Sequence, residues 1–253
     1  MSNHALITLA DALRGRRTKV GTRWRRLSAG EPAVLVLAHL REGDTYAELA
    51  AGYGIGTTTV FRYISEAIEV LAALAPTLAT AMAVIKAKAF VILDGTLLRI
   101  DRVGMGSGRD RPYYSGMHTC HGVNVQVIAD PAGRLVWASA AIPGARHDMG
   151  AAREHGILEA LQSAQVKVIA DNRYRGSGFE VPQRRHPKDP ETGKRRKLSR
   201  NQRDVNSAHA RQRRPGERAN AQLKAWRILR KIRCCPRRAT DIVKTVLVLT
   251  HAG

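Results

Sequence analysis

The middle of the chain contains two short apolar runs that each lead into an aspartate. Phe90–Leu93 is followed by Asp94 and a glycine, and the run that begins at Val166 is followed by Asp171 and a polar turn. Short, partly β-branched runs bounded by turn residues predict buried strands. A single acid after such a strand is most often a loop or cap residue, because a buried charge without a partner is unfavourable. Since the pattern occurs twice, it predicts two carboxylates at one edge of a sheet, held together by a divalent cation.

The residues between these aspartates have a strand-like pattern followed by a helical one. His118–Gly144 predicts two strands that form an antiparallel hairpin around the turn Asp130–Gly133. A helix over Met149–Leu161 then leads into the strand that ends at Asp171. Because a strand–helix–strand step favours parallel neighbours, the strands of Asp94 and Asp171 are expected side by side. The predicted fold class is α/β, a mixed sheet with flanking helices.

Residues 44–75 have a helical pattern interrupted by the glycine-rich turn Gly52–Gly56. A helix over 45–51 precedes the turn, and Thr57 is a candidate N-cap of a second helix through Ala73. The apolar residues at the core positions of a helix-turn-helix are Ala47, Leu49, Ile55, Val60 and Ile64. The exposed side chains that open the second helix, suited to DNA phosphates and base edges, are Thr57, Thr58, Thr59 and Arg62. An ordinary helical hairpin is the alternative, and the basic composition favours DNA binding.

The segments around this module are also helical. Residues 11–27 are basic and predict a partly helical arm, for which a solvated tail is the alternative. A helix over Glu31–Arg41 has proline in its first turn, where proline is tolerated. Glu66–Ala89 is alanine-rich, is interrupted by Pro76, and predicts a helical linker. The predicted organisation is a basic arm and helix over 1–43, a helix-turn-helix domain with its linker over 44–87, and an α/β domain over 88–253.

After Asp171 the chain becomes strongly basic and turns helical. The turn-rich loop 186–200 predicts an exposed DNA contact, with a merely solvated loop as the alternative. Its run of positive side chains is Lys194, Arg195, Arg196 and Lys197. Helices are expected over 200–211, over Gly216–Ile232 and over Ile242–Leu249. The apolar stripe of the middle helix, which can dock on the sheet, is Ala219, Leu223, Trp226 and Leu229.

Composition narrows the class of partner. The chain has 253 residues and a formal net charge of +21, which implies a polyanionic partner, most commonly nucleic acid. Only 5% of the residues are aromatic, which argues against a basic amphipathic helix on a membrane. No apolar run is long enough to span a bilayer, and the start of the chain lacks the apolar segment of a signal peptide. The expectation is a cytoplasmic protein that is associated with the nucleoid through DNA binding.

The cysteines do not predict a zinc site. There are three, an odd number without zinc-finger spacing, which indicates a reduced protein. His118 and His121 flank Cys120, but the two histidines face opposite sides of a strand and no second ligand pair has zinc spacing.

Glu217 adds a third carboxylate, carried on a helix. Two strand-end aspartates and a helix-borne glutamate, together with the strand and helix order, fit an RNase H-like core. Cleavage of a phosphodiester requires an activated water or hydroxyl and a stabilised leaving oxygen, and two Mg²⁺ ions about 3.5–4 Å apart supply both. Lys224 lies seven residues after Glu217, about 20° away around the helix axis.

The chain resembles the DDE transposases of bacterial insertion sequences, in the insertion-sequence-5 group, which is related to Harbinger-type transposases. The matching segments are LDGT around Asp94, PGARHDM over Pro143–Met149, ADNRYRG around Asp171 and RRPGERANAQLK around Glu217. Their order, spacing and strand context together are fairly specific, and the resemblance extends from about Asp44 to Leu249.

This resemblance implies a site and its partners. Asp94, Asp171 and Glu217 would be the catalytic residues and would bind two divalent metal ions, Mg²⁺ with Mn²⁺ as a possible substitute. The family pattern of arginine, glutamate and lysine falls on Arg213, Glu217 and Lys224, so the two basic residues would hold phosphates near the site. His147 and Asp148 would be active-site neighbours, with helix capping as the alternative for Asp148. The implied partner is double-stranded DNA, both transposon terminal repeats and target DNA, bound by a homo-oligomer.

The sequence departs from the family pattern beside the second aspartate. Asn172 and Arg173 stand where the family often has lysine and glycine, and Ala210 replaces its usual tyrosine. One alternative function is therefore a transposase-derived DNA-binding protein, inactive or domesticated, that binds without cleavage. A stand-alone RNase H-like nuclease would explain the three acids but not the amino-terminal DNA-binding module.

Overall fold

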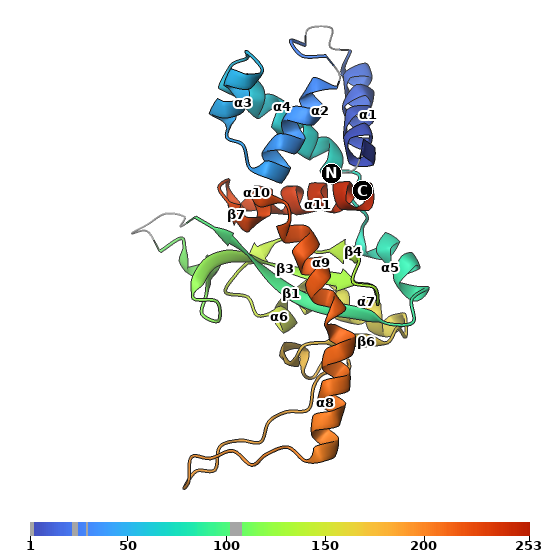
Figure 1. Cartoon of the computed structure of the whole chain (residues 1–253), viewed down its shortest axis with the longest axis vertical. Helices are drawn as coiled ribbons and strands as arrows, with labels where there is room; N and C mark the ends of the chain where they lie inside the picture. Colours follow the sequence, from blue (N-terminus) through green and yellow to red (C-terminus); the bar gives the residue numbers. More distant parts are fainter. Residues whose placement is uncertain (1–2, 22–24, 29, 102–107) are drawn as a thin grey trace.

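The computed structural model describes residues 3–21, 25–28, 30–101 and 108–253. Figure 1 shows a helical amino-terminal part at one end, a mixed sheet in the middle, and a long helix that extends away from the sheet at the other end. Among the described residues, no helix is both long enough and apolar enough to cross a membrane.

The strands of the described residues form one mixed sheet centred on β1 and β3. The strands are β1 (Val91–Ile100), β2 (Tyr114–Ser115), β3 (Cys120–Ala129), β4 (Leu135–Ala138), β5 (Ile142–Pro143), β6 (Val168–Ala170) and β7 (Lys231–Ile232). β3 is antiparallel to β1 and to its other neighbours β2, β4 and β5. On its other side β1 pairs in parallel with β6 near its start and with β7 near its end. The predicted α/β class, the hairpin and the parallel pairing of the two aspartate-bearing strands are confirmed.

The predicted end of the first strand was wrong. β1 continues past Asp94 to Ile100, because it is paired with β3 along most of its length. This pairing begins with Ile92 opposite Ala129 and ends with Arg99 opposite Gly122. Asp94 therefore lies inside a strand and not after one. β6, in contrast, ends at Ala170, opposite Leu93, and Asp171 follows the strand as predicted.

Helices cover both faces of the sheet. The helices of this region are α5 (Leu78–Lys86), α6 (Asp148–Glu154), α7 (Ile157–Ser163), α8 (Arg200–Arg213), α9 (Pro215–Lys224), α10 (Arg227–Arg230) and α11 (Ala239–His251), of which α8 extends away from the sheet (Figure 1). Short 3-10 turns occur at Arg111–Tyr113, Asn172–Tyr174 and Pro236–Arg238. The helix predicted over 149–161 is divided in two, because Gly156 adopts a left-handed conformation with φ of 66° between α6 and α7.

The helix predicted over Gly216–Ile232 ends at Lys224. Trp226 leaves the helical conformation with ψ of 112°, and after the short α10 the chain pairs with β1 as β7. The tertiary contacts explain the break: the Trp226 indole is buried, and the Arg41 guanidinium of the helical part lies 5.4 Å from its ring centroid. All four residues of the predicted apolar stripe are buried nevertheless.

The amino-terminal part consists of helices that pack on α4. They are α1 (Asn3–Val20), α2 (Glu31–Leu37), a π-helical turn (Ala38–Glu42), α3 (Tyr46–Gly52) and α4 (Thr57–Ala72). The predicted basic arm begins within α1, whose buried face includes Leu9 and Leu13, and residues 22–24 of that arm lie outside the described residues. Arg25 makes two hydrogen bonds, of 2.8 and 2.7 Å, to the Glu66 carboxylate on α4.

The helix-turn-helix prediction is confirmed in its elements and wrong in two details. Gly56, not Thr57, is the N-cap of α4, and no side chain caps that helix. Ala47 is exposed and Ala50 is buried in its place. α3 begins with a capping box, in which the Thr45 and Glu48 side chains each accept from the other's backbone N–H.

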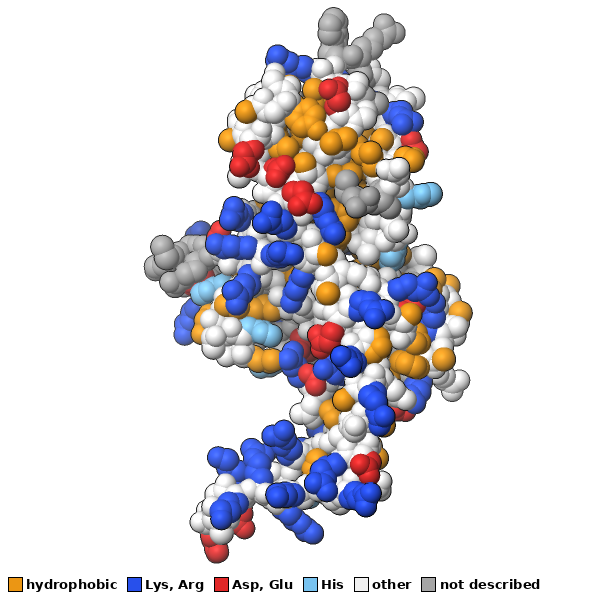
Figure 2. All heavy atoms as spheres, in the orientation of Figure 1, with side chains coloured by type: hydrophobic (Ala, Val, Ile, Leu, Met, Phe, Trp, Pro, Cys, Tyr) orange, Lys and Arg blue, Asp and Glu red, His pale blue; other side chains and the backbone are white. Residues whose placement is uncertain are grey.

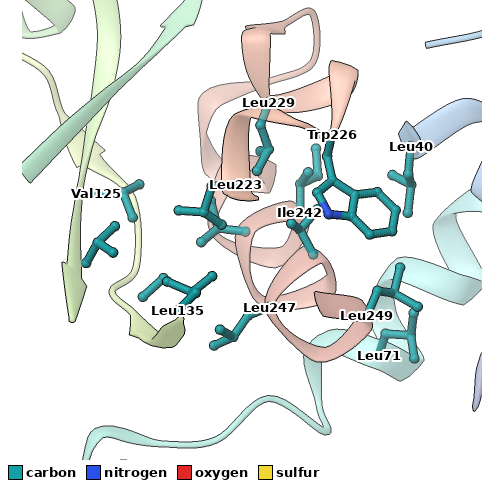
Figure 3. Close-up of a cluster of buried hydrophobic side chains, with 14 of the residues drawn as sticks. Leu40, Leu71, Val125, Leu135, Leu223, Trp226, Leu229, Ile242, Leu247 and Leu249 are labelled. Carbon is teal, nitrogen blue, oxygen red and sulfur yellow. The ribbon is translucent and has the colours of Figure 1, made fainter. Parts of the chain in front are cut away.

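Helix α11 joins the helical part to the sheet. Figure 3 shows Leu247 of α11 beside Leu135 of β4, and Leu249 beside Leu71 of α4. The buried Thr245 hydroxyl donates to the Ile68 carbonyl oxygen at 3.2 Å, which ties α11 to α4. The helix at the end of the chain is thus part of the core of both regions, and the domain boundaries at residues 43/44 and 87/88 remain predictions.

Candidate active site

Three carboxylates from distant parts of the sequence line one cavity of about 360 Å³ beside β1. Asp94 comes from inside β1, Asp171 from the residue after β6, and Glu217 from the first turn of α9. The parallel register explains the first two, since Ala170 lies opposite Leu93. The third is positioned by α9, which packs on the sheet so closely that a Cβ at Gly216 would lie 2.7 Å from Ile92.

Asp94 is the most buried of the three carboxylates, with 8% of the residue exposed. Its Oδ1 accepts from the Gly95 backbone N–H at 3.0 Å and its Oδ2 from Asn220 Nδ2 at 3.0 Å. Burial raises the pKa of Asp94 to about 6; the Arg213 guanidinium opposes this, and the negative charges of Glu217 and Asp171 add to it. The site therefore concentrates negative charge where a cation would be favourable.

Arg213, the last residue of α8, lies between two of the carboxylates. Its Nη1 is 3.5 Å from Asp94 Oδ2 and its Nη2 is 3.3 Å from Glu217 Oε1. Glu217 is otherwise open to solvent, because 60% of its side chain is exposed. The arginine that the resemblance assigns to phosphate binding thus offsets part of the negative charge of the cavity in this structure.

Asp171 is held by the residues that follow it. Its Oδ1 accepts from the Asn172 backbone N–H at 2.6 Å, and Arg173 Nε is 3.4 Å from its Oδ2. Arg173 is also hydrogen-bonded to Asp148, with 2.7 Å between Nη1 and Oδ2. The residue that departs from the family pattern therefore links Asp171 to a second, buried carboxylate.

The capping role considered for Asp148 is wrong. His147 occupies the N-cap position of α6 without a side-chain hydrogen bond and is exposed, and Asp148 is the first residue of the helix. Asp148 Oδ1 instead accepts from Asn124 Nδ2 at 2.7 Å. A Cβ at Gly95 would overlap that same oxygen, so the close approach requires glycine. Because neighbouring residues of a strand face opposite sides, Asp148 lies across the sheet from Asp94.

A chain of buried hydrogen bonds extends from Asp148 into the core. Asn124 Oδ1 accepts from Gln126 Nε2 at 2.8 Å, and Gln126 Oε1 accepts from the Tyr174 hydroxyl at 2.5 Å. Burial raises the pKa of Tyr174, so the phenol remains a donor. The sequence interpretation missed these residues, although two polar side chains at alternate positions of the apolar strand β3 were a visible signal.

Oxygen donors of the kind that Mg²⁺ prefers face the cavity. Besides the carboxylates, the buried Asn220 Oδ1 has no hydrogen-bond partner within the described residues, although its Nδ2 is bonded to Asp94. No three histidine, cysteine or acidic side chains of that part of the chain are close enough together to hold a metal ion. The donor atoms are of the type that a hard cation prefers, but to hold one the carboxylates would have to move closer together and Arg213 would have to leave its place between Asp94 and Glu217.

The residues predicted to contact DNA lie at three places. Thr57, Thr58 and Arg62 are exposed at the start of α4, and Thr59 is half-buried there. The basic run Lys194–Lys197 is exposed in the loop that precedes α8, and this loop and α8 extend away from the sheet in Figure 1. Lys224 lines the carboxylate cavity.

The model of one protein family, described as DDE superfamily endonuclease, matches residues 93–251. The chain belongs to this family. The matched range includes all three carboxylates of the cavity. A second model, the helix-turn-helix of DDE superfamily endonucleases, matches residues 25–77 and so covers α2 to α4. Searches of curated proteins and of solved structures find no match.

Membership of the DDE superfamily confirms the resemblance at the level of the superfamily and of the helix-turn-helix. It supports DNA cleavage and DNA binding as the general activities of the chain. Endonucleases of this superfamily use divalent metals. The assignment of individual residues rests on the geometry described above.

Proposed function

We propose that the protein is a DNA transposase of the insertion-sequence-5 and Harbinger-like group, which binds transposon end repeats and catalyses metal-dependent strand cleavage and transfer. The observation that carries this proposal is the convergence of Asp94, Asp171 and Glu217 on one cavity, in a chain that also contains a helix-turn-helix. Arg213 supplies one positive charge for these three carboxylates, so the remaining repulsion among them favours the binding of a further cation.

The three carboxylates would hold two divalent ions, with Asn220 Oδ1 as a further oxygen donor for one of them. When bound, Mg²⁺ would activate the attacking oxygen and stabilise the leaving oxygen of a phosphodiester. Arg213 then exchanges its carboxylate partners for a phosphate of the DNA, and Lys224, which lines the same cavity, contacts a second phosphate. A homo-oligomer would bring two ends together.

Sequence recognition is assigned to α4. Its exposed Thr57, Thr58 and Arg62 would meet base edges and phosphates in the major groove. The exposed loop with Lys194–Lys197 would contact the backbone of terminal-repeat or target DNA and add affinity without sequence preference. Such binding would associate the protein with the nucleoid.

The test separates cleavage from binding. Glu217→Gln keeps the size of an exposed side chain and removes a carboxylate, so it should abolish strand cleavage in Mg²⁺ or Mn²⁺ and leave affinity for DNA unchanged or higher. Neutral replacement of Lys194, Arg195, Arg196 and Lys197 should weaken binding to every sequence. The slope of log affinity against log salt should fall by about 0.9 for each phosphate that the variant no longer binds. The measurements are end cleavage and gel-shift binding across a salt series.

One observation favours a second function, a transposase-derived protein that binds DNA without cleaving it. Arg173, where the family often has glycine, brings a guanidinium against Asp171 and competes with a cation for that carboxylate. In that case the parent protein binds DNA but does not cleave it in Mg²⁺ or in Mn²⁺. Recovery of cleavage by Arg173→Gly would then identify the cause.

A further inference from the structure

A basic segment lies between the helical part and the sheet, and of its residues the sequence interpretation singled out only Lys224 as a contact to DNA. The stretch from Lys224 to Arg238 contains no aspartate or glutamate. Its basic residues are Lys224, Arg227, Arg230, Lys231, Arg233, Arg237 and Arg238. All of them except Arg238 are exposed. Figure 2 shows Lys and Arg side chains gathered on this face, just below the helical part.

A groove of about 580 Å³ separates this segment from α3. Asp44, Thr45 and Tyr46 line one side of it, and Arg230, Lys231 and Arg233 are among the residues that line the other. The side chains of Ile64, Ile68 and Ile242 also line the groove. Next to the groove, α11 and α4 are in contact through the hydrogen bond from the buried Thr245 hydroxyl to the Ile68 carbonyl oxygen, which fixes the two sides relative to each other.

Some of the basic side chains of this junction groove hold the protein together. Arg227 Nη1 donates to the Glu42 carbonyl oxygen at 2.9 Å, and Arg238 Nη2 donates to Ser65 Oγ at 3.1 Å. Others are available. Arg233 has no side-chain hydrogen bond or ion pair within the described residues, and Lys231 is paired at 2.6 Å only with the exposed Asp101 carboxylate. An exposed pair of this kind contributes little, so Lys231 can change partners.

The junction groove connects the carboxylate cavity to the DNA-reading helix. At one end Lys231 pairs in the sheet with Arg99, and Arg99 lines the cavity of Asp94, Asp171 and Glu217. At the other end the Arg238 guanidinium lies 5.5 Å from the ring centroid of Phe61 on α4. Phe61 is one helical turn after Thr58, on the exposed side of that helix.

We propose that Lys231 and Arg233 at the junction groove bind the phosphate backbone of duplex DNA, between the bases read by α4 and the phosphodiester held at the carboxylate cavity. DNA that occupies both sites has to cross this face, and cations that bind its phosphates there release counterions from the DNA. The inference rests on the proposed function, because it requires that α4 and the cavity act on the same DNA. It assigns an interaction that would fix the distance between recognition and cleavage.

The test compares two double variants of the full chain on a mixed-sequence DNA duplex. In Lys231→Gln/Arg233→Gln, the slope of log affinity against log salt should become shallower by about 1.8, which is 0.9 for each of the two phosphates released. The control, Lys86→Gln/Arg153→Gln, removes the same charge from exposed side chains of α5 and α6 that have no partner within the described residues. Its slope should equal that of the parent. Arg233→Lys, which retains the charge, should also bind with the parent slope.

A second readout gives the position of the bound phosphates. Phosphate ethylation should interfere with binding of the parent at phosphates between the sequence read by α4 and the cut, and Lys231→Gln/Arg233→Gln should lose only that interference. The inference is overturned if the groove variant keeps the parent slope, or if the control changes equally. It is also overturned if the groove variant loses only self-association, since the groove would then be a protein interface. Failure of the proposed function is distinguishable, because there the parent itself would not bind DNA, or would bind and not cut.

Discussion

Replacement of Asp94 by asparagine should stabilise the protein in the absence of divalent cations. The buried carboxylate has its pKa raised from an ordinary value of 3.8 to about 6, chiefly by burial. The charged form is therefore less favourable in the folded than in the unfolded protein. At 1.36 kcal/mol for each pKa unit, this corresponds to about 3 kcal/mol at neutral pH.

The expected net gain is smaller than this figure. The carboxylate accepts one hydrogen bond from Gly95 N–H and one from Asn220 Nδ2, on different oxygens. An asparagine amide has a single acceptor oxygen, so one of the two bonds is lost at a cost of about 1 kcal/mol. Asp94→Asn should thus stabilise the folded state by about 2 kcal/mol at pH 7. For a protein of this size, that raises Tm by about 4–8 °C.

The pH dependence follows from the direction of the shift. Below pH 3.8 the carboxyl is protonated in both the folded and the unfolded protein, and its burial costs nothing. The cost develops as pH rises from about 4 to about 6 and is complete above that. The stability difference between variant and parent should therefore be small at pH 4 and grow toward pH 7. Urea unfolding in EDTA across this range measures it.

A matched control is Asp130→Asn, which should have the opposite effect. Although burial acts to raise the pKa of Asp130, the hydrogen bonds from Arg134 outweigh it and the pKa is lowered. This carboxylate stabilises the fold above its unfolded pKa, and that contribution is lost as pH falls. Addition of Mg²⁺ should stabilise the parent but not Asp94→Asn. The reasoning about Asp94 is refuted if its variant is less stable than the parent at pH 7 in EDTA.

Other substitutions test the packing around the site, each by urea unfolding at pH 7. Gly95→Ala places a Cβ against the Asp148 carboxylate and should destabilise the fold by about 1–3 kcal/mol; an unchanged midpoint would show that the carboxylate moves freely. Arg173→Gly leaves the buried Asp148 without its counter-charge and should lower the free energy of unfolding by about 1–3 kcal/mol. The double variant Asp148→Asn/Arg173→Gly should be as stable as Asp148→Asn alone. Thr45→Ala removes the capping box of α3 and should cost about 1 kcal/mol, whereas Thr57→Ala, at a position without a cap bond, should cost less.

The sequence by itself determined the elements with strong periodicity or strong local signals. The apolar runs before Asp94 and Asp171 gave their strands, and the glycine-rich turn between α3 and α4 gave the helix-turn-helix, because burial pattern and turn chemistry act within a few residues. The nearness of Asp94 and Asp171 also followed, since the parallel pairing of neighbouring strands brings these two residues side by side.

Tertiary structure alone decided the features that depend on contacts between distant residues. The long pairing with β3 carried β1 past Asp94, and the burial of Trp226 ended α9 at Lys224, although the local helical pattern continued. The link from Asp171 through Arg173 to Asp148 joins residues on opposite faces of the sheet, and no local pattern specifies such an arrangement. Local sequence sets which conformation each segment favours, whereas the packing partners of a buried side chain are set by the whole fold.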